Sequence, residues 1–123
     1  MWDVSFEGIC LDGTVTFLAG SGVTVDNEGH VGKLSAAKTI NVCSAEDVFY
    51  GVIGKVEEKA GVLALERRGM NPVPYTGTIA AGWKELVANG SGGVKPPATP
   101  GAGRMFHVVD VNATDGLLVL DLG

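Results

Sequence analysis

The segment DVFYGVIGKVEEKAGVLALE, residues 47–66, decides the fold class of this chain. Its first half is apolar and rich in β-branched residues, its middle (EEKAG) is polar and ends in glycine, and VLALE is apolar again. Two such runs separated by a short glycine-containing segment are typical of a β-hairpin. The segment therefore predicts two antiparallel strands.

The C-terminal segment shows the same pattern. RMFHVVDV and LLVLDL flank NATDG, in which Asp115-Gly116 is a strong turn signal. Nearer the N-terminus, GVTVDNEGHVGKL predicts a short strand around Val23 and Val25, a turn at residues 26–29 and a return through Val31. The sequence thus predicts an all-β protein with tight turns.

The remaining segments give weaker signals. Residues 33–47 read as a loop that contains the short strand TINV, and residues 96–103 (PPATPGAG) as a flexible loop. RRGMNPVPYTG reads as a linker, because Pro72 and Pro74 lack the N–H that a central strand needs. Residues 1–18 are expected to form an extended arm or an edge strand, and residues 19–123 a single β domain.

Composition limits the function classes. The 123 residues suit one domain, and 19 glycines favour many turns. The net charge is −5 and the basic residues are not clustered, so no nucleic-acid partner is expected. No apolar run approaches the ~20 residues of a spanning helix, so no membrane partner is expected. No secretion signal is recognised, which predicts synthesis in a cytoplasm.

An internal repeat organises these strands. Phe49 matches Phe106, and the run GVLAL from Gly61 matches GLLVL from Gly116. The two copies cover residues 19–69 and 81–123. Two such units would each bury the apolar face of the other. We therefore expect a small single-domain β-barrel or sandwich built from two similar strand–turn–hairpin units, with a hairpin rather than a helix in GWKELVANGSGGV.

The glycine-rich stretch ANGSGGVKPP raises the question of a phosphate-binding loop. A P-loop needs a lysine followed by a hydroxyl residue at the start of a helix. Here Lys95 is followed by Pro96 and Pro97, and the proline biases the lysine towards an extended conformation. The glycines are therefore interpreted as turn residues.

The sequence contains few side chains that could act in catalysis or bind a metal. Cys10, Cys43, His30 and His107 have spacings that match no compact metal motif, so no metal and no cofactor are expected. A cysteine–histidine nucleophile pair would need hydrogen-bond contact, which sequence does not show. No catalytic residue is predicted, and the chain is expected not to be an enzyme.

Exposed apolar residues are better candidates for function. Trp2 and Phe6 lie in the N-terminal segment, outside the repeat. Such an arm either packs on another chain or covers the barrel of its own chain. Both alternatives remain open at this point.

The order of these segments resembles the capsid decoration (cement) proteins of tailed bacteriophages. The residues that carry the resemblance are GVTVDNEGHV, FYGVIGKV and VLALE in the first half, and AAGWKELVANGSGGVKPP and LLVLDLG in the second. The resemblance covers most of residues 19–123. Its motifs are glycine turns and apolar strands, and thus of low specificity.

The resemblance implies a structural virion protein, made in the bacterial host cytoplasm, that binds the outer surface of the phage head. Its partner would be the major capsid protein, whose subunit contacts it would stabilise, and a homotrimer is the implied oligomer. Many identical sites on a lattice would turn modest contacts into high avidity. The predicted interface residues are Trp2, Phe6, Pro96, Pro97 and Pro100.

Three alternatives stay open. The first is an SH3-like or OB-like β-barrel module that binds a peptide or ligand, although aromatic residues make up only 7% of the chain. The second is a small enzyme that uses a cysteine with a histidine. The third is another structural protein of the phage head or tail.

Overall fold

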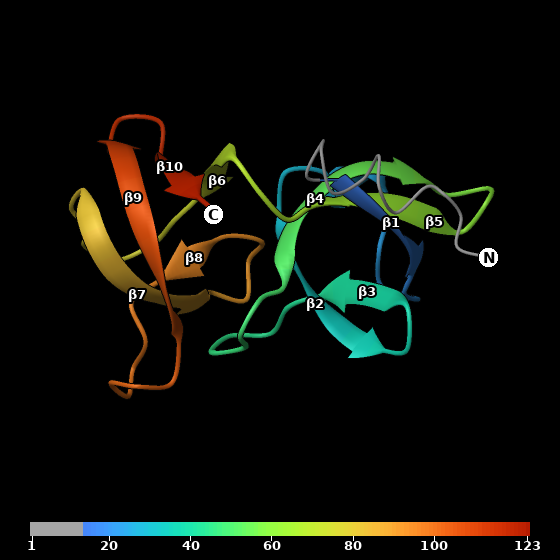
Figure 1. The fold of residues 1–123 in the computed structure, drawn as a ribbon, viewed down its shortest axis with the longest axis horizontal. Coiled ribbons are helices and arrows are strands. Elements are labelled where there is room, and N and C mark those ends of the chain that lie inside the picture. The colour runs from blue at the N-terminus through green and yellow to red at the C-terminus, as the bar shows by residue number, and fades with distance from the viewer. Residues whose placement is uncertain (1–13) are drawn as a thin grey trace.

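The computed structural model describes residues 14–123, which form ten strands and one 3-10 helix (Figure 1). The first unit contains β1 (Thr14–Ala19), η1 (Val25–Asn27), β2 (Val31–Ala36), β3 (Thr39–Val42), β4 (Gly51–Glu57) and β5 (Val62–Glu66). The second contains β6 (Met70–Pro74), β7 (Gly82–Ala88), β8 (Val94–Lys95), β9 (Arg104–Asn112) and β10 (Leu117–Asp121). The predicted all-β class is confirmed.

The two units share one topology. The first is a closed barrel of order β1-β3-β2-β4-β5, in which β1 pairs in parallel with β3. The second is a five-stranded sheet of order β6-β10-β9-β7-β8. Because the first barrel is closed, its order can also be read in the other direction, as β1-β5-β4-β2-β3. With β6 to β10 in the places of β1 to β5, this is the order of the second sheet. A single parallel bridge, Tyr75 to Val94, joins the ends of the second sheet where the first barrel has its parallel pair.

The hairpins that the sequence predicts are present. β4 pairs with β5 and β9 with β10, both antiparallel and each with one register irregularity. Gly61 and Gly116 occupy equivalent turn positions with the same φ of +69°. The strand TINV is β3, and GWKELVANGSGGV forms the β7–β8 hairpin.

The structural correspondence differs from the sequence match in the first part of each unit. The sequence places residues 22–31 opposite residues 82–94, whereas by topology β7 corresponds to β2. The equivalent strands therefore span residues 14–66 and 70–121 rather than 19–69 and 81–123. The similar glycine turns at Gly29 and Gly92, both at positive φ, explain the shifted match.

The strand predicted around Val23 and Val25 is wrong, because Val25 belongs to the helical turn η1. The turn predicted at residues 26–29 is present, and the return through Val31 is the start of β2. The Asn27 side chain accepts a hydrogen bond from the Thr24 N–H at 2.7 Å, and the Thr24 hydroxyl accepts one from Asp26 at 3.3 Å. These local polar contacts form a capping box, which favours the helical turn over a strand. Residues 33–36, predicted as loop, belong to β2.

The predicted linker is also wrong, because it contains β6. This strand pairs only with β10 among the named strands, so it lies at the edge of the second sheet. Pro72 and Pro74 are tolerated there because an edge strand needs hydrogen-bond donors on one side only. Likewise, residues 14–18 of the predicted arm or edge strand form most of β1, which has neighbours on both sides.

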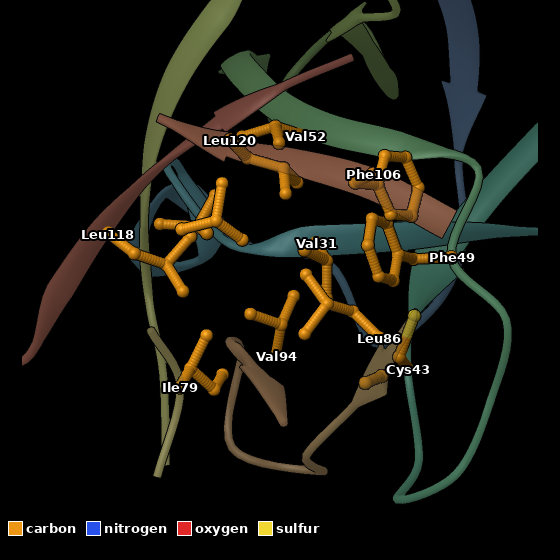
Figure 2. Packing of buried hydrophobic residues seen from close by; sticks show 13 residues of the cluster. Val31, Cys43, Phe49, Val52, Ile79, Leu86, Val94, Phe106, Leu118 and Leu120 are labelled. Carbon is orange, nitrogen blue, oxygen red and sulfur yellow. The ribbon is translucent and has the colours of Figure 1, made fainter. Parts of the chain in front are cut away.

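The two units share part of their core. One cluster of buried residues fills the first barrel: Val23, Ile40, Ile53, Val56, Leu63 and Leu65. The other joins the second unit to Val31, Cys43, Phe49 and Val52 of the first (Figure 2). Within it the rings of Phe49 and Phe106 stack at 5.0 Å with an interplanar angle of 12°.

Backbone hydrogen bonds reinforce this junction. Ala88 at the end of β7 accepts from the Glu46 N–H and donates to the Asp47 carbonyl, both at 2.9 Å. The Val31 N–H donates to the Gly92 carbonyl at 2.9 Å. Backbone hydrogen bonds and a common core therefore hold the two units together.

Candidate functional site

The outward side of the second sheet carries a row of side chains across four strands. Register pairs link Met70 to Asp121, Asp121 to His107, and His107 to Trp83. Directly paired residues project from the same side of a sheet. Trp83 is 58% exposed and Met70 64%. The Trp83 indole meets the His107 imidazole edge to face, with ring centroids 4.5 Å apart.

A second pair extends this surface. Met105 is paired with Glu85 and is exposed, as is Val109 further along β9. They alternate with Phe106 and Val108, which point into the core. We call this surface the Trp83 face and define it by its residues: Met70, Trp83, Glu85, Met105, His107, Val109 and Asp121.

A shallow hollow interrupts the Trp83 face near the end of β10. It encloses about 320 Å³, and Trp83 and Met105 meet the C-terminal residues Asp121 to Gly123 around it. Arg104 also lines it, with its guanidinium 5.3 Å from the centre of the Phe106 ring. The hollow offers an apolar wall, one cation and one carboxylate to a partner side chain.

The loop between β8 and β9 adjoins the Trp83 face. Pro96 and Pro100 are exposed and Pro97 is half-buried. The Glu85 carboxylate accepts hydrogen bonds from the Gly101 and Gly103 N–H groups at 3.1 and 2.8 Å.

The other end of this loop is held from the first unit. Glu46 accepts a hydrogen bond from the Ala98 N–H at 3.0 Å and forms an ion pair with Lys95. The predicted loop is confirmed, and the carboxylates of Glu46 and Glu85 accept hydrogen bonds from its backbone at the two ends.

A groove on the first barrel has a volume of about 600 Å³. It follows β1 and is walled by the rings of Phe17 and Tyr50, which meet edge to face at 5.9 Å. The Arg67 guanidinium lies 3.7 Å from the centre of the Tyr50 ring, and its Nε donates to the Tyr50 carbonyl at 3.0 Å. Lys38 supplies a second cation. The groove is thus apolar with two cations.

The glycine-rich stretch before β8 is a turn, as the sequence indicates. The Asn89 side-chain oxygen accepts from the N–H groups of Ser91 and Gly93 at 2.8 and 3.0 Å. Gly90 and Gly92 take positive φ, which the turn requires. The N–H groups of Ser91 and Gly93 are therefore engaged by the side-chain amide of Asn89.

Cys43 and His30 line a common hollow of about 280 Å³ between the units. Burial, with a smaller contribution from Asp47, raises the pKa of the Cys43 thiol to about 12. A thiol with this pKa is protonated near neutral pH and is a poor nucleophile. Between residues 14 and 123, no group of three or more His, Cys, Asp or Glu side chains is placed to hold a metal ion.

Of the predicted interface residues, the structure describes Pro96, Pro97 and Pro100, which share the β8–β9 loop. Trp2 and Phe6 lie outside the described residues. Sequence reasoning missed the Trp83 face, because Trp83 was considered only within a choice between helix and hairpin. The alternation of exposed and buried residues in RMFHVV is the signal that could have found it.

Comparison with protein-family models and with curated proteins finds no match for this chain. Among residues 14–123 there is no helix with the length and apolarity needed to cross a membrane.

Proposed function

We propose that this chain is a structural virion protein that binds the outer surface of a phage head and stabilises contacts between major capsid subunits. The observation that carries the proposal is the combination of the Trp83 face with the hydrogen-bonded β8–β9 loop. Together they expose the apolar side chains of Met70, Trp83, Met105 and Val109, with Pro96 and Pro100 on the loop. The proposal also draws on the resemblance of the glycine turns and strands to decoration proteins.

The chemistry of this surface suits protein binding. Trp and Met are enriched in the centres of protein interfaces, and a few such residues supply most of the binding energy. Because Glu85 and Glu46 already order the loop, little conformational entropy is lost on binding. In this proposal Trp83 and Met105 are the central contacts, with Pro96, Pro97 and Pro100 beside them.

The wider proposal follows the same role. The protein is made in the bacterial host cytoplasm, is located on the capsid surface, and acts without catalysis, nucleic acid or membrane. A homotrimer is its proposed oligomer. Trp2 and Phe6 remain predicted interface residues, for which the described residues give no test.

Co-sedimentation with mature phage heads that lack the protein tests the proposal. We expect saturable binding to mature heads and none to procapsids. Trp83→Ala should weaken binding by about tenfold or more, since interface tryptophans commonly contribute ≥ 2 kcal/mol. Val25→Ala removes an equally exposed apolar side chain from the first unit and should leave binding unchanged. Absence of binding to mature heads would contradict the proposal.

A β-barrel binding module is the second candidate, and the groove on the first barrel favours it. Its aromatic walls and two cations are features that bind peptides or small ligands. Arg67→Ala separates the two functions: a groove-binding module would lose its ligand, whereas binding to the head through the Trp83 face would persist. A different role in the phage head or tail would show as binding to another virion component instead of mature heads.

A further inference from the structure

The groove beside β1 is apolar, cationic and without an assigned occupant among the described residues. Val15, Leu18 and Val62 supply its aliphatic surface next to the Phe17 and Tyr50 rings. Lys38 and Arg67 are the charged side chains that line it, and no carboxylate from the described residues does so. The molecule that fits this groove best is therefore one with apolar side chains and a negative charge.

The first thirteen residues of this chain have that chemistry. The sequence MWDVSFEGICLDG contains three acidic residues and no lysine or arginine. In its first seven residues the apolar side chains Trp2, Val4 and Phe6 alternate with polar ones. A period of two places the three apolar side chains on one side of an extended backbone and Asp3 and Glu7 on the other.

The attachment point of this segment lies at the groove. The segment joins β1 at Thr14, whose hydroxyl donates to Glu66 at 3.0 Å, and the next residue, Arg67, lines the groove. The groove follows β1 from Val15 to Leu18. Thirteen residues can span roughly 40 Å when extended. The segment is therefore long enough to reverse at Gly13 and run back along the whole groove.

The pairing of β1 decides how such a segment can bind. β1 pairs with β5 over residues 14–18 but with β3 only at Leu18 and Ala19, so among the described residues the β3-side edge of residues 14–17 has no partner strand. The segment can therefore bind through side chains laid over the groove and through backbone pairing along that edge. Trp2, Val4 and Phe6 suit the groove, because one row of apolar side chains can enter it while the negative charge of the segment is attracted to the two cations.

We propose that the N-terminal segment, residues 1–12, binds the groove of its own chain and covers Phe17 and Tyr50. Tethering through Gly13 gives the segment an effective concentration in the millimolar range, which favours the same chain over a neighbour. Of the two alternatives for Trp2 and Phe6, covering the chain's own barrel is the one that the groove supports. This proposal concerns the free protein and does not depend on capsid binding.

Methyl NMR of the full chain tests this arrangement. The indole ring current of Trp2 would shift the methyl resonances of Val15, Leu18 and Val62. Trp2→Ala should move these three sets of resonances and leave those of the second unit in place. Trp83→Ala is the matched control, and it should move Val109 and leave the groove methyls unchanged.

A second variant tests the charge complementarity. Replacing Asp3, Glu7 and Asp12 by lysine should release the segment and reproduce the groove shifts of Trp2→Ala. These positions precede β1, so the barrel need not be disturbed. Lys59→Glu changes an exposed charge in the β4–β5 turn, outside the groove, and should leave the groove spectrum unchanged.

The outcomes decide the proposal. Groove methyls that do not respond to Trp2→Ala would overturn it. Groove methyls that respond to Trp2→Ala but not to the charge reversal would overturn the electrostatic part. A labelled wild-type chain mixed with unlabelled Trp2→Ala chain distinguishes the neighbouring copy: altered groove shifts in the mixture would place the segment on a second chain and overturn the same-chain arrangement.

Discussion

Gly93 shows how one missing side chain lets the two ends of the second sheet approach each other. A Cβ atom at this position would lie 2.3 Å from the Pro74 carbonyl oxygen. That carbonyl belongs to the edge strand β6, and Gly93 directly precedes β8. The close approach allows the parallel bridge between Tyr75 and Val94. Steric space, rather than backbone freedom, is the reason for glycine here.

Gly93→Ala should therefore destabilise the protein by about 3 kcal/mol, at the upper end of overpacking costs, because the atom in the way is backbone. Gly101→Ala is the comparison: φ there is +91°, but a Cβ would meet nothing within 4 Å. Its cost should be about 1 kcal/mol from left-handed strain alone. Chemical denaturation measures both, and equal losses would contradict the steric explanation.

Cys43 provides a second prediction for a single residue. Its pKa of about 12, against an ordinary value of 9.0, lowers the thiolate fraction at pH 8 by about a thousandfold. In a Cys10→Ser background, Cys43 should react with a thiol reagent far more slowly in the native protein than in denaturant. Similar rates in the two conditions would contradict its burial and revive the cysteine-enzyme alternative.

At the scale of elements, one ion pair connects β2 to the loop before β4. The Lys33 ammonium donates to Asp47 at 2.7 Å, and the same carboxylate accepts from the Ser44 N–H at 2.8 Å. The Lys33 hydrogen bond, followed by that of Ser44, lowers the pKa of Asp47. The hydrogen bond from Lys33 to Asp47 in turn raises the Lys33 pKa above 10.5.

The pH dependence follows from these directions. A lowered carboxyl pKa contributes stability above the unfolded value of 3.8, and the contribution is lost as pH falls through the folded pKa. A raised ammonium pKa contributes below 10.5 and is lost as pH rises through the folded value. The pair should therefore stabilise fully between about pH 4 and 10.

Asp47→Asn should reduce the loss of stability at low pH. The measurement is the denaturation midpoint between pH 2 and 7, which should depend less on pH in the variant. Asp26→Asn alters an exposed carboxylate in η1 and serves as the control. A wild-type profile as flat as that of Asp47→Asn would show that the ion pair contributes nothing to stability.

A strand or turn could be predicted where the residues that determine it are neighbours in the sequence. The β4–β5 and β9–β10 hairpins were predictable because both strands and the turn are adjacent in sequence. Strand β6 was not, since its two prolines argue against a strand until its edge position is known. The turn η1 was missed because Asn27 and Thr24 bond to local backbone, and that competition is not visible in an apolar pattern.

At the scale of the whole molecule, the shared core should make the two units unfold together. Phe106→Ala removes the ring that stacks on Phe49 and should cost about 3–5 kcal/mol. Amide exchange should then accelerate in β4 as well as in β9, because the cavity lies between the units. Val109→Ala, on the exposed side of the same strand, should change stability by no more than about 0.5 kcal/mol. Faster exchange in β9 alone would contradict the common core.

The Trp83 face and the groove were only partly predictable from the sequence, because they depend on how the whole chain folds. The proline loop stood out by composition, and its residues are exposed next to the Trp83 face. The face itself combines side chains from β6, β7, β9 and β10, which only the sheet order brings together. The groove likewise combines β1, Tyr50 and Arg67, whose proximity depends on barrel closure.

The prolines of β6 affect how this protein behaves when many copies lie close together. An unprotected sheet edge is a template on which a neighbouring chain can add a strand, and the risk grows with local concentration. In this fold the strands of the first unit close into a barrel, β8 has only two residues, and Pro72 and Pro74 interrupt the donors along β6. Many copies can therefore be held close together on one surface without strands joining from molecule to molecule, and amyloid-like fibres are disfavoured even at high density.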